Sequence, residues 1–183
     1  MEDIEVQISN ILILDFLAIG DLLFATPLLD TLRTNFKKAK IYLSIQKQLI
    51  DIMKYNQDID EIIPFDKNGE HNSFIGYMKF IKNLRETDLD MVITLQDNPR
   101  LALLAALSGS PERIGFANSK SRQIFYSKPI VPKNRQHRVE YYLDIARNIK
   151  QVDEIIDNGL KLSINNKEKD WAVNILYRCD INK

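Results

Sequence analysis

A short apolar run, followed by a Gly-Asp pair and a helical pattern, most limits what this chain can fold into. Residues 11–14 read Ile-Leu-Ile-Leu, which is typical of a strand buried on both faces within a parallel sheet. Ligands of such sheets bind where strands end and helices begin. The sequence therefore places Asp21 at a candidate site, with Gly20 leaving room beside its carboxylate. The spacing alone equally allows Asp21 to be only an N-cap and Gly20 only a turn residue.

Strand and helix patterns alternate along the rest of the chain. We expect strands over residues 10–15, 41–45, 61–65, 91–95, 113–116, 124–126 and 160–164. We expect helices over residues 21–35, 47–55, 74–84, 100–107, 138–149 and 167–178. Pro27 either kinks the first helix or marks the start of its regular part. The alternation predicts an α/β fold with a Rossmann-like, doubly wound and mainly parallel sheet whose first strand is central.

One predicted helix has a broad apolar face. In the helix over residues 74–84, this face is formed by Phe74, Ile75, Met78, Ile81 and Leu84. Spacings of three and four residues place such side chains on one side of a helix. We therefore expect this helix to pack against the sheet along that side.

Length and composition exclude several classes of protein. A chain of 183 residues suits one domain, residues 1–183, with a sizeable core. Lys plus Arg and Asp plus Glu both number 25, whereas nucleic-acid binding favours a strongly basic domain. Cys179 is the single cysteine, so we expect no intrachain disulfide, a reducing compartment and a passive thiol.

The sequence also lacks the marks of export and of membrane insertion. The acidic first residues do not resemble the basic start of a signal peptide. Nor does any apolar stretch approach the roughly 18–20 residues that span a bilayer. We therefore expect a cytoplasmic protein that could contact the inner face of the membrane only peripherally.

The chain carries no nucleotide or metal motif. Its six glycines never form G-x-G, so the dinucleotide fingerprint and the P-loop are both missing. His71 and His137 lie far apart, and no Cys or His pair has metal-ligand spacing. We therefore expect no metal or cofactor, and we expect the nucleotide of any substrate to be held elsewhere.

Two groups of polar residues could carry chemistry. Asp21 could accept the proton of a substrate hydroxyl as a general base. After the strand over residues 91–95 come four residues that could hydrogen-bond substrate hydroxyls or an anionic group: Gln96, Asp97, Asn98 and Arg100. The alternative for Asp97 and Asn98 is that they only cap the next helix.

A basic run lies between residues 120 and 138. It consists of Lys120, Arg122, Lys128, Lys133, Arg135, His137 and Arg138. Acidic sugars, phosphorylated lipid or a membrane surface would suit such a run. The alternative is a charged face that only contacts solvent.

Three stretches together resemble glycosyltransferase family 9, the ADP-heptose:lipopolysaccharide heptosyltransferases. The family's opening motif is similar to residues 19–36, IGDLLFATPLLDTLRTNF. Its second strand, helix and N-x-x-(I/V)-D-E-(I/V)-I segment are similar to residues 41–67. Its fourth strand, Leu-Gln, polar loop, apolar helix and Arg-Ile-Gly-Phe are similar to residues 89–116. The resemblance covers about residues 11–149.

The resemblance implies a fold and a reaction. Family members have two Rossmann-like domains in the GT-B arrangement. The N-terminal domain holds the lipopolysaccharide-core acceptor, and the C-terminal domain holds the nucleotide-sugar donor, ADP-heptose. The reaction inverts the anomeric centre without a metal, and the Asp of the Gly-Asp motif, here Asp21, is the general base. The family also tends to place a His near an aromatic-rich helix, as His137 is here, with Arg138 beside it.

The chain departs from the family pattern in two ways. Many members carry Arg or Lys where this chain has Asp15, which puts the acceptor contacts there in question. The chain also stops at Lys183, where the family would begin its donor-binding half. We therefore expect an acceptor domain alone, inactive by itself, from an expressed fragment or a truncated gene product.

Two other hypotheses compete with this reading. One is a non-catalytic module that binds an acceptor or a partner. The other is an unrelated α/β domain of the flavodoxin or receiver type, in which Asp66 and Lys120 would stand roughly at the functional positions. A receiver, however, also needs an acidic pair after its first strand, and only Asp15 follows residues 11–14.

Overall fold

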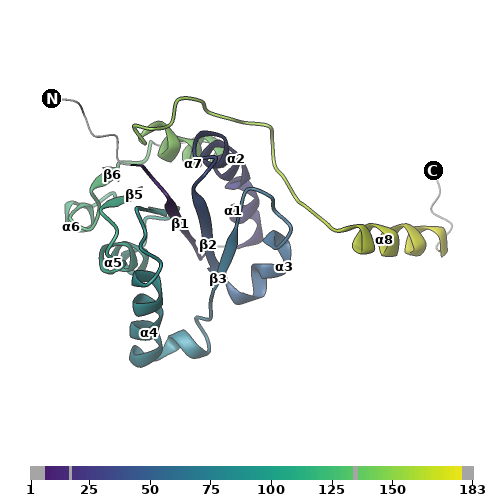
Figure 1. Ribbon diagram of the computed structural model, residues 1–183, viewed down its shortest axis with the longest axis horizontal. Helices are drawn as coiled ribbons and strands as arrows, with labels where there is room; N and C mark the ends of the chain where they lie inside the picture. The colour runs from purple at the N-terminus through teal and green to yellow at the C-terminus, as the bar shows by residue number, and fades with distance from the viewer. Residues whose placement is uncertain (1–6, 17, 134–135, 179–183) are drawn as a thin grey trace.

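A six-stranded parallel sheet forms the centre of the molecule (Figure 1). The computed structural model describes residues 7–16, 18–133 and 136–178. The strands are β1 (Asn10–Asp15), β2 (Lys40–Gln46), β3 (Glu61–Phe65), β4 (Met91–Thr94), β5 (Glu112–Phe116) and β6 (Lys128–Ile130). Their order is β3-β2-β1-β4-β5-β6, and every neighbouring pair is parallel.

This strand order decides between two of the hypotheses. It is the order of the Rossmann fold, in which β1 is central and the crevice lies where the order reverses. The predicted fold class is therefore confirmed. Flavodoxin-like and receiver domains have the order 2-1-3-4-5, so the hypothesis of a receiver or flavodoxin type is wrong.

Helices cover both faces of the sheet. Alternate side chains of a strand point to opposite faces, and those of residues 11–14 in β1 are all fully buried. Ile11 and Ile13 belong to one core with α1 (Ile19–Phe24), α2 (Thr26–Asn35) and α7 (Arg138–Arg147). Leu12 and Leu14 belong to the other core with α4 (Phe74–Arg85) and α5 (Pro99–Leu107).

The predicted first helix is in fact two helices. α1 ends at Phe24 and α2 begins at Thr26, with Ala25 between them. Pro27 stands in the first turn of α2, where its missing N–H interrupts no helical hydrogen bond. The alternative that the regular helix starts near Pro27 is thus correct, and the short helix α1 carries Asp21.

Other boundaries differ from prediction for local reasons. The helix expected over residues 47–55 is a 3₁₀ turn, η1 (Lys47–Leu49), followed by α3 (Ile50–Met53). A second 3₁₀ turn, η2 (Glu70–Asn72), precedes α4. The strand expected over residues 124–126 is wrong, because these residues form the turn between α6 (Lys120–Gln123) and β6. Tyr126 is buried there, and its hydroxyl and that of Thr94 are joined by a 2.7 Å hydrogen bond.

The expected apolar face of α4 is only partly buried. Ile81 and Leu84 pack into the core as predicted, together with Phe80. Phe74 and Ile75, in contrast, are each 80% exposed. The first turn of α4 therefore lies outside the core.

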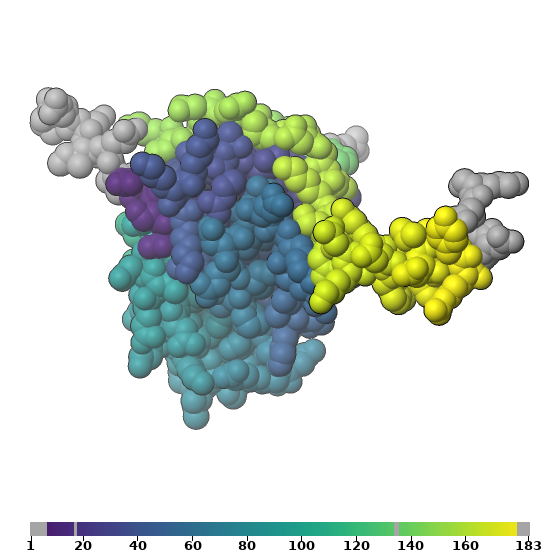
Figure 2. Space-filling view, turned by 45° about the vertical axis from the view of Figure 1, so that its right-hand side comes forward, coloured from purple at the N-terminus to yellow at the C-terminus, as the bar shows by residue number. Residues whose placement is uncertain are grey.

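The strand expected over residues 160–164 is also wrong. Residues 151–165, here called the strap, run extended over α2, and α8 (Asn166–Arg178) follows (Figures 1 and 2). Side chains of α2 take the place of a neighbouring strand. Asn35 Nδ2 donates to the carbonyl of Glu154 at 2.7 Å, and Thr31 Oγ1 accepts from the N–H of Ile156 at 2.9 Å. These bonds satisfy backbone groups that a strand would have paired in the sheet.

Candidate functional site

Asp21 lies in the first turn of α1, beside the carboxyl end of β1. Its side chain is 24% exposed. Ala18 is the N-cap of α1, so the alternative that Asp21 is an N-cap is wrong. A Cβ added at Gly20 would meet no atom within 4 Å. The space beside Asp21 is thus open toward solvent.

Two side chains of α7 hold the Asp21 carboxylate. Arg138 Nε lies 3.0 Å from Asp21 Oδ1, and the hydroxyl of Tyr142 donates to the same oxygen at 3.4 Å. Tyr142 is fully buried. Burial, with the Asp15 and Asp21 carboxylates nearby, raises the pKa of Tyr142. Its hydroxyl therefore stays protonated and can act as a donor at any physiological pH.

Aromatic rings of α7 support Arg138. The guanidinium lies over the rings of Tyr141 and Tyr142, at 5.2 and 5.8 Å from their centroids. Tyr141 is itself stacked on Phe116 at 3.8 Å, and its burial raises the pKa of Tyr141 to about 12. Both rings therefore remain neutral, and a neutral ring face attracts a cation.

Gln96 and Asp15 connect the ends of β4 and β1. Asp15 is 1% exposed, and Gln96 Nε2 donates to its Oδ1 at 2.8 Å. A buried carboxylate requires such polar partners. The position where many family members were expected to carry a cation is thus a buried acid in this chain, and it orients Gln96.

Asp97 and Arg122 are paired with each other. Arg122 Nε lies 2.7 Å from Asp97 Oδ1. Asn118 donates to Asp97 Oδ2 from its backbone N–H at 3.1 Å and from its Nδ2 at 2.8 Å. Asp97 is therefore not a helix cap, and the group ties the loop after β4 to the loop after β5. Asn98 is the cap of α5, because its side chain accepts from the N–H of Arg100 at 2.8 Å.

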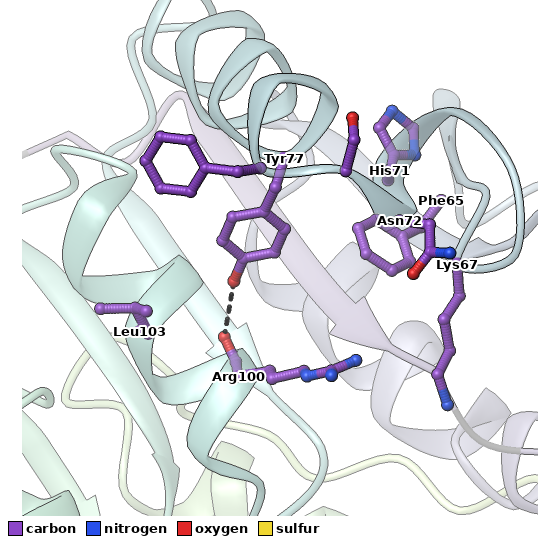
Figure 3. A pocket seen from close by; sticks show the side chains of 9 residues that line it. Phe65, Lys67, His71, Asn72, Tyr77, Arg100 and Leu103 are labelled. Carbon is purple, nitrogen blue, oxygen red and sulfur yellow. Dashed lines mark hydrogen bonds between the residues drawn. The ribbon is translucent and has the colours of Figure 1, made fainter.

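Arg100 and Lys67 border an open hollow at the same edge of the sheet (Figure 3). It consists of two adjoining parts of about 530 Å³ and about 290 Å³. The larger part is lined by Phe16, Phe65, Lys67, Tyr77, Gln96, Asn98, Pro99, Arg100 and Leu104. Within the described residues, neither Lys67 nor Arg100 has a carboxylate partner. Both cations extend toward the opening (Figure 3).

The basic run between residues 120 and 138 is largely neutralised by carboxylates. Besides the pairs of Arg122 and Arg138, Lys128 lies 3.3 Å from Glu112 and Lys133 lies 3.0 Å from Asp144. His137 is the N-cap of α7, and its Nδ1 accepts from the N–H of Val139 at 3.4 Å. Arg135 and Cys179 lie outside the described residues. Most cations of this run therefore pair with carboxylates of the same chain, and the run does not form a free positive surface.

The sheet edge thus assembles residues that the sequence had placed in separate groups. Asp21, Gln96 and Arg100 lie where the strands end, as predicted. Tyr142 and Lys67 were not predicted as site residues. Tyr142 stands four residues after Arg138 on one helix, and Lys67 follows directly after a strand, so both signals were present in the sequence.

No group of three or more His, Cys, Asp or Glu side chains among the described residues is placed to hold a metal ion. No helix in that part of the chain has the length and apolarity to cross a bilayer.

Comparison with known proteins gives a family match and several relatives. The model of glycosyltransferase family 9 (heptosyltransferase) matches residues 77–174. Lipopolysaccharide heptosyltransferase 3 of Escherichia coli K12 is 32% identical over 146 residues, which are 77% of this chain and 42% of that protein. The chain therefore spans less than half the length of this curated relative.

Solved structures share the architecture. A glycosyltransferase family 9 protein from Veillonella parvula superposes with a TM-score of 0.84 at 26% identity, over 93% of this chain and 49% of that chain. Heptosyltransferase II of E. coli superposes with a TM-score of 0.70 at 19% identity, over 91% and 50% of the two chains. Because its sequence identity is low, the similarity to heptosyltransferase II shows only that the fold is shared.

Proposed function

Because this chain belongs to glycosyltransferase family 9, the heptosyltransferase family, we propose that it forms the acceptor-binding half of an inverting glycosyltransferase. The enzyme would transfer heptose or a related sugar from a nucleotide-sugar such as ADP-heptose to an acceptor like the lipopolysaccharide core, without a metal ion. One observation carries this proposal. Asp21 is a partly exposed carboxylate at the carboxyl edge of the central strand, held by Arg138 and Tyr142.

In the proposed reaction Asp21 is the general base. The acceptor hydroxyl attacks the anomeric carbon from the face opposite the nucleoside diphosphate, so that one C–O bond forms as the other breaks. The hydroxyl proton passes to the Asp21 carboxylate, and the diphosphate leaves with the electron pair of the broken bond. A sugar hydroxyl is a weak nucleophile, so removing its proton in the transition state lowers the barrier.

Arg138 and Tyr142 have a positioning role in this proposal. Arg138 forms an ion pair with Asp21 Oδ1, and Tyr142 donates to the same oxygen, which leaves Oδ2 as the oxygen that can face an acceptor hydroxyl. The open space beside Gly20 gives that hydroxyl room. When the base is fixed in this way, orienting it costs less free energy as the substrate binds.

The acceptor would bind at the carboxyl edge of the sheet, where Asp21 follows β1 and where the hollow opens. Gln96 and Arg100 line the hollow, and they are the best supported of the proposed substrate contacts. Asn98, Asp97, Arg122 and His137 are engaged in caps and ion pairs. They would therefore shape the site, and they would reach the acceptor only if those bonds open.

A transfer assay tests the proposal. The protein carrying both family halves is incubated with ADP-heptose and a lipopolysaccharide acceptor that lacks heptose, with and without EDTA. We expect heptose transfer with inverted anomeric configuration, read by NMR, and equal rates in both buffers. Binding of the acceptor without any transfer would instead support the non-catalytic binding module.

A further inference from the structure

We propose that the outward face of α4 docks on a bilayer containing anionic lipid. This docking surface consists of Phe74, Ile75 and Met78 on α4, Leu103 on α5, and the cations Lys67, Lys79, Lys82 and Arg100 around them. The proposal does not depend on the transfer reaction. It assigns membrane contact to a different part of the chain from the basic run between residues 120 and 138.

The apolar part of the surface has no role in the core. Phe74 and Ile75 are each 80% exposed, and Met78 and Leu103 are each 38% exposed. α4 already packs on the sheet through Phe80, Ile81 and Leu84, so folding does not require the exposed residues. Adjacent exposed apolar side chains of this size mark interaction surfaces.

The helix geometry gathers these residues on one side. Phe74 and Met78 are four residues apart, and Lys82 follows four residues later, so all three lie along one stripe. Ile75 and Lys79 form a second, neighbouring stripe. The helix therefore presents apolar side chains at its start and lysines behind them. Lysine stems can lie along an apolar surface while their ammonium groups reach lipid phosphates.

α4 and α5 contribute to a single surface. Phe74 and Leu103 line the same part of the hollow, with Lys67 and Arg100 beside them (Figure 3). The apolar residues therefore border the opening through which a lipid-linked molecule would reach the sheet edge. In Figure 1, α4 and the turn before it project from the end of the molecule away from the strap and α8.

Charge selects an anionic bilayer as the occupant. Lys79 lies 3.3 Å from Glu70, and Lys82 lies 3.7 Å from Glu86. Both pairs are exposed and contribute little, so lipid phosphates can compete for these lysines. Lys67 and Arg100 have no carboxylate partner among the described residues, which leaves the surface with excess positive charge. Anionic lipid attracts each such cation near its surface.

Vesicle co-sedimentation tests the surface in the 183-residue chain. We expect binding to phosphatidylethanolamine–phosphatidylglycerol vesicles and much weaker binding to phosphatidylcholine alone. Phe74→Ser with Ile75→Ser should weaken binding at least about tenfold, because two apolar side chains no longer leave water. Lys79→Ala with Lys82→Ala should reduce the affinity for vesicles. The affinity of this variant should also fall less than that of the unaltered chain when salt is raised from about 0.1 M to about 0.5 M.

Ile124→Ser is the matched control, because Ile124 is 76% exposed at the end of α6. It should bind vesicles like the unaltered chain, and circular dichroism should show all variants folded. Absence of vesicle binding, unchanged binding of the Phe74/Ile75 variant, or an equal loss in Ile124→Ser would overturn the proposal. So would light scattering that shows a dimer which the Phe74/Ile75 variant dissociates, since the occupant would then be a second copy. Loss of vesicle binding in the protein carrying both halves would likewise overturn it.

Discussion

Asp21 is held by an ion pair with Arg138 and a hydrogen bond from Tyr142, and as a base it would contribute only in the transition state. In the protein carrying both halves, Asp21→Asn should lower kcat by about 10²–10⁴-fold, because the amide cannot take the proton. The melting temperature should hardly change, since a partly exposed ion pair contributes only about 0–1 kcal/mol. Asp51→Asn, at the exposed side of α3, is the control. A near-normal kcat in Asp21→Asn would leave this residue a structural one.

The structure changes the expected cost of removing the whole Asp21 side chain. From sequence, Asp21→Ala would also have lost an N-cap at about 0.5–2 kcal/mol. Ala18 occupies the cap position and makes no side-chain cap bond. The stability of Asp21→Ala and of Asp21→Asn should therefore be similar, which thermal melts of the two variants can check.

Arg100 gives a contrasting kinetic outcome. If its guanidinium holds the acceptor in the hollow, Arg100→Ala should raise the acceptor KM more than it lowers kcat, because ground-state binding is lost. Steady-state kinetics with both substrates varied measures this. Asp51→Asn, on the exposed side of α3 and outside both proposed binding surfaces, is the control. An Arg100→Ala enzyme that loses kcat at constant KM would place Arg100 in the chemistry instead.

At the scale of elements, α2 and the strap stabilise each other through one asparagine. Asn35 Nδ2 donates to Glu154 O at 2.7 Å, and its Oδ1 accepts from the N–H groups of Asp153 and Glu154 at 2.9 and 3.1 Å. Asn35→Ala should lower the free energy of unfolding by about 1–3 kcal/mol. It should also speed hydrogen exchange at those two amides. Thr34→Ala on the neighbouring position is the control, and unchanged exchange in Asn35→Ala would contradict this role.

The bonds of Asp144, near the end of α7, to Lys133 and Gln136 before that helix should respond to acid. Burial pushes the pKa of the Asp144 carboxyl up, but hydrogen bonds from Gln136, Arg147 and Lys133 outweigh it and hold the pKa below its usual range. An unfolded Asp takes up its proton near pH 4, so the unfolded state binds more protons just below that pH. The stabilisation is complete above about pH 4 and is lost as the pH falls through the folded pKa.

Replacing Asp144 shows how much of the pH dependence of stability comes from this carboxylate. Asp144→Asn should have a lower free energy of unfolding than the unaltered chain at neutral pH. As the pH is lowered, its free energy of unfolding should then decrease less steeply than that of the unaltered chain. Urea unfolding at a series of pH values measures both. Asp51→Asn, whose side chain is 84% exposed, should keep the original slope. Parallel curves for Asp144→Asn and the unaltered chain would contradict the assignment.

At the scale of the whole molecule, these 183 residues should show no appreciable transferase activity by themselves. Transfer needs donor and acceptor held in line, and that positioning supplies much of the rate. The residues align with 42% of the heptosyltransferase 3 chain and carry no phosphate-binding glycine motif. Incubation with ADP-heptose and a heptose-deficient acceptor checks this, and robust turnover would refute it.

The sequence by itself determined the sheet and the position of Asp21. The apolar run in β1 can be stable only when buried on both faces, and a residue just after such a strand must lie at the carboxyl edge of the sheet. Periodicity likewise predicted the part of the α4 face that carries Ile81 and Leu84. These features follow from the local chain, because strand and helix periods depend on neighbouring residues.

Only the tertiary structure decided which polar groups are free. Asp97, Arg122, Lys133 and Arg138 all looked available in sequence, yet each meets an opposite charge from a distant segment. Residues 160–164 had the composition of a strand, but the N–H of Lys161 donates to the side chain of Thr26 in α2, and the segment pairs with no strand of the sheet. Pairing of charges and of backbone groups depends on which segments the fold brings together, and no local pattern records that.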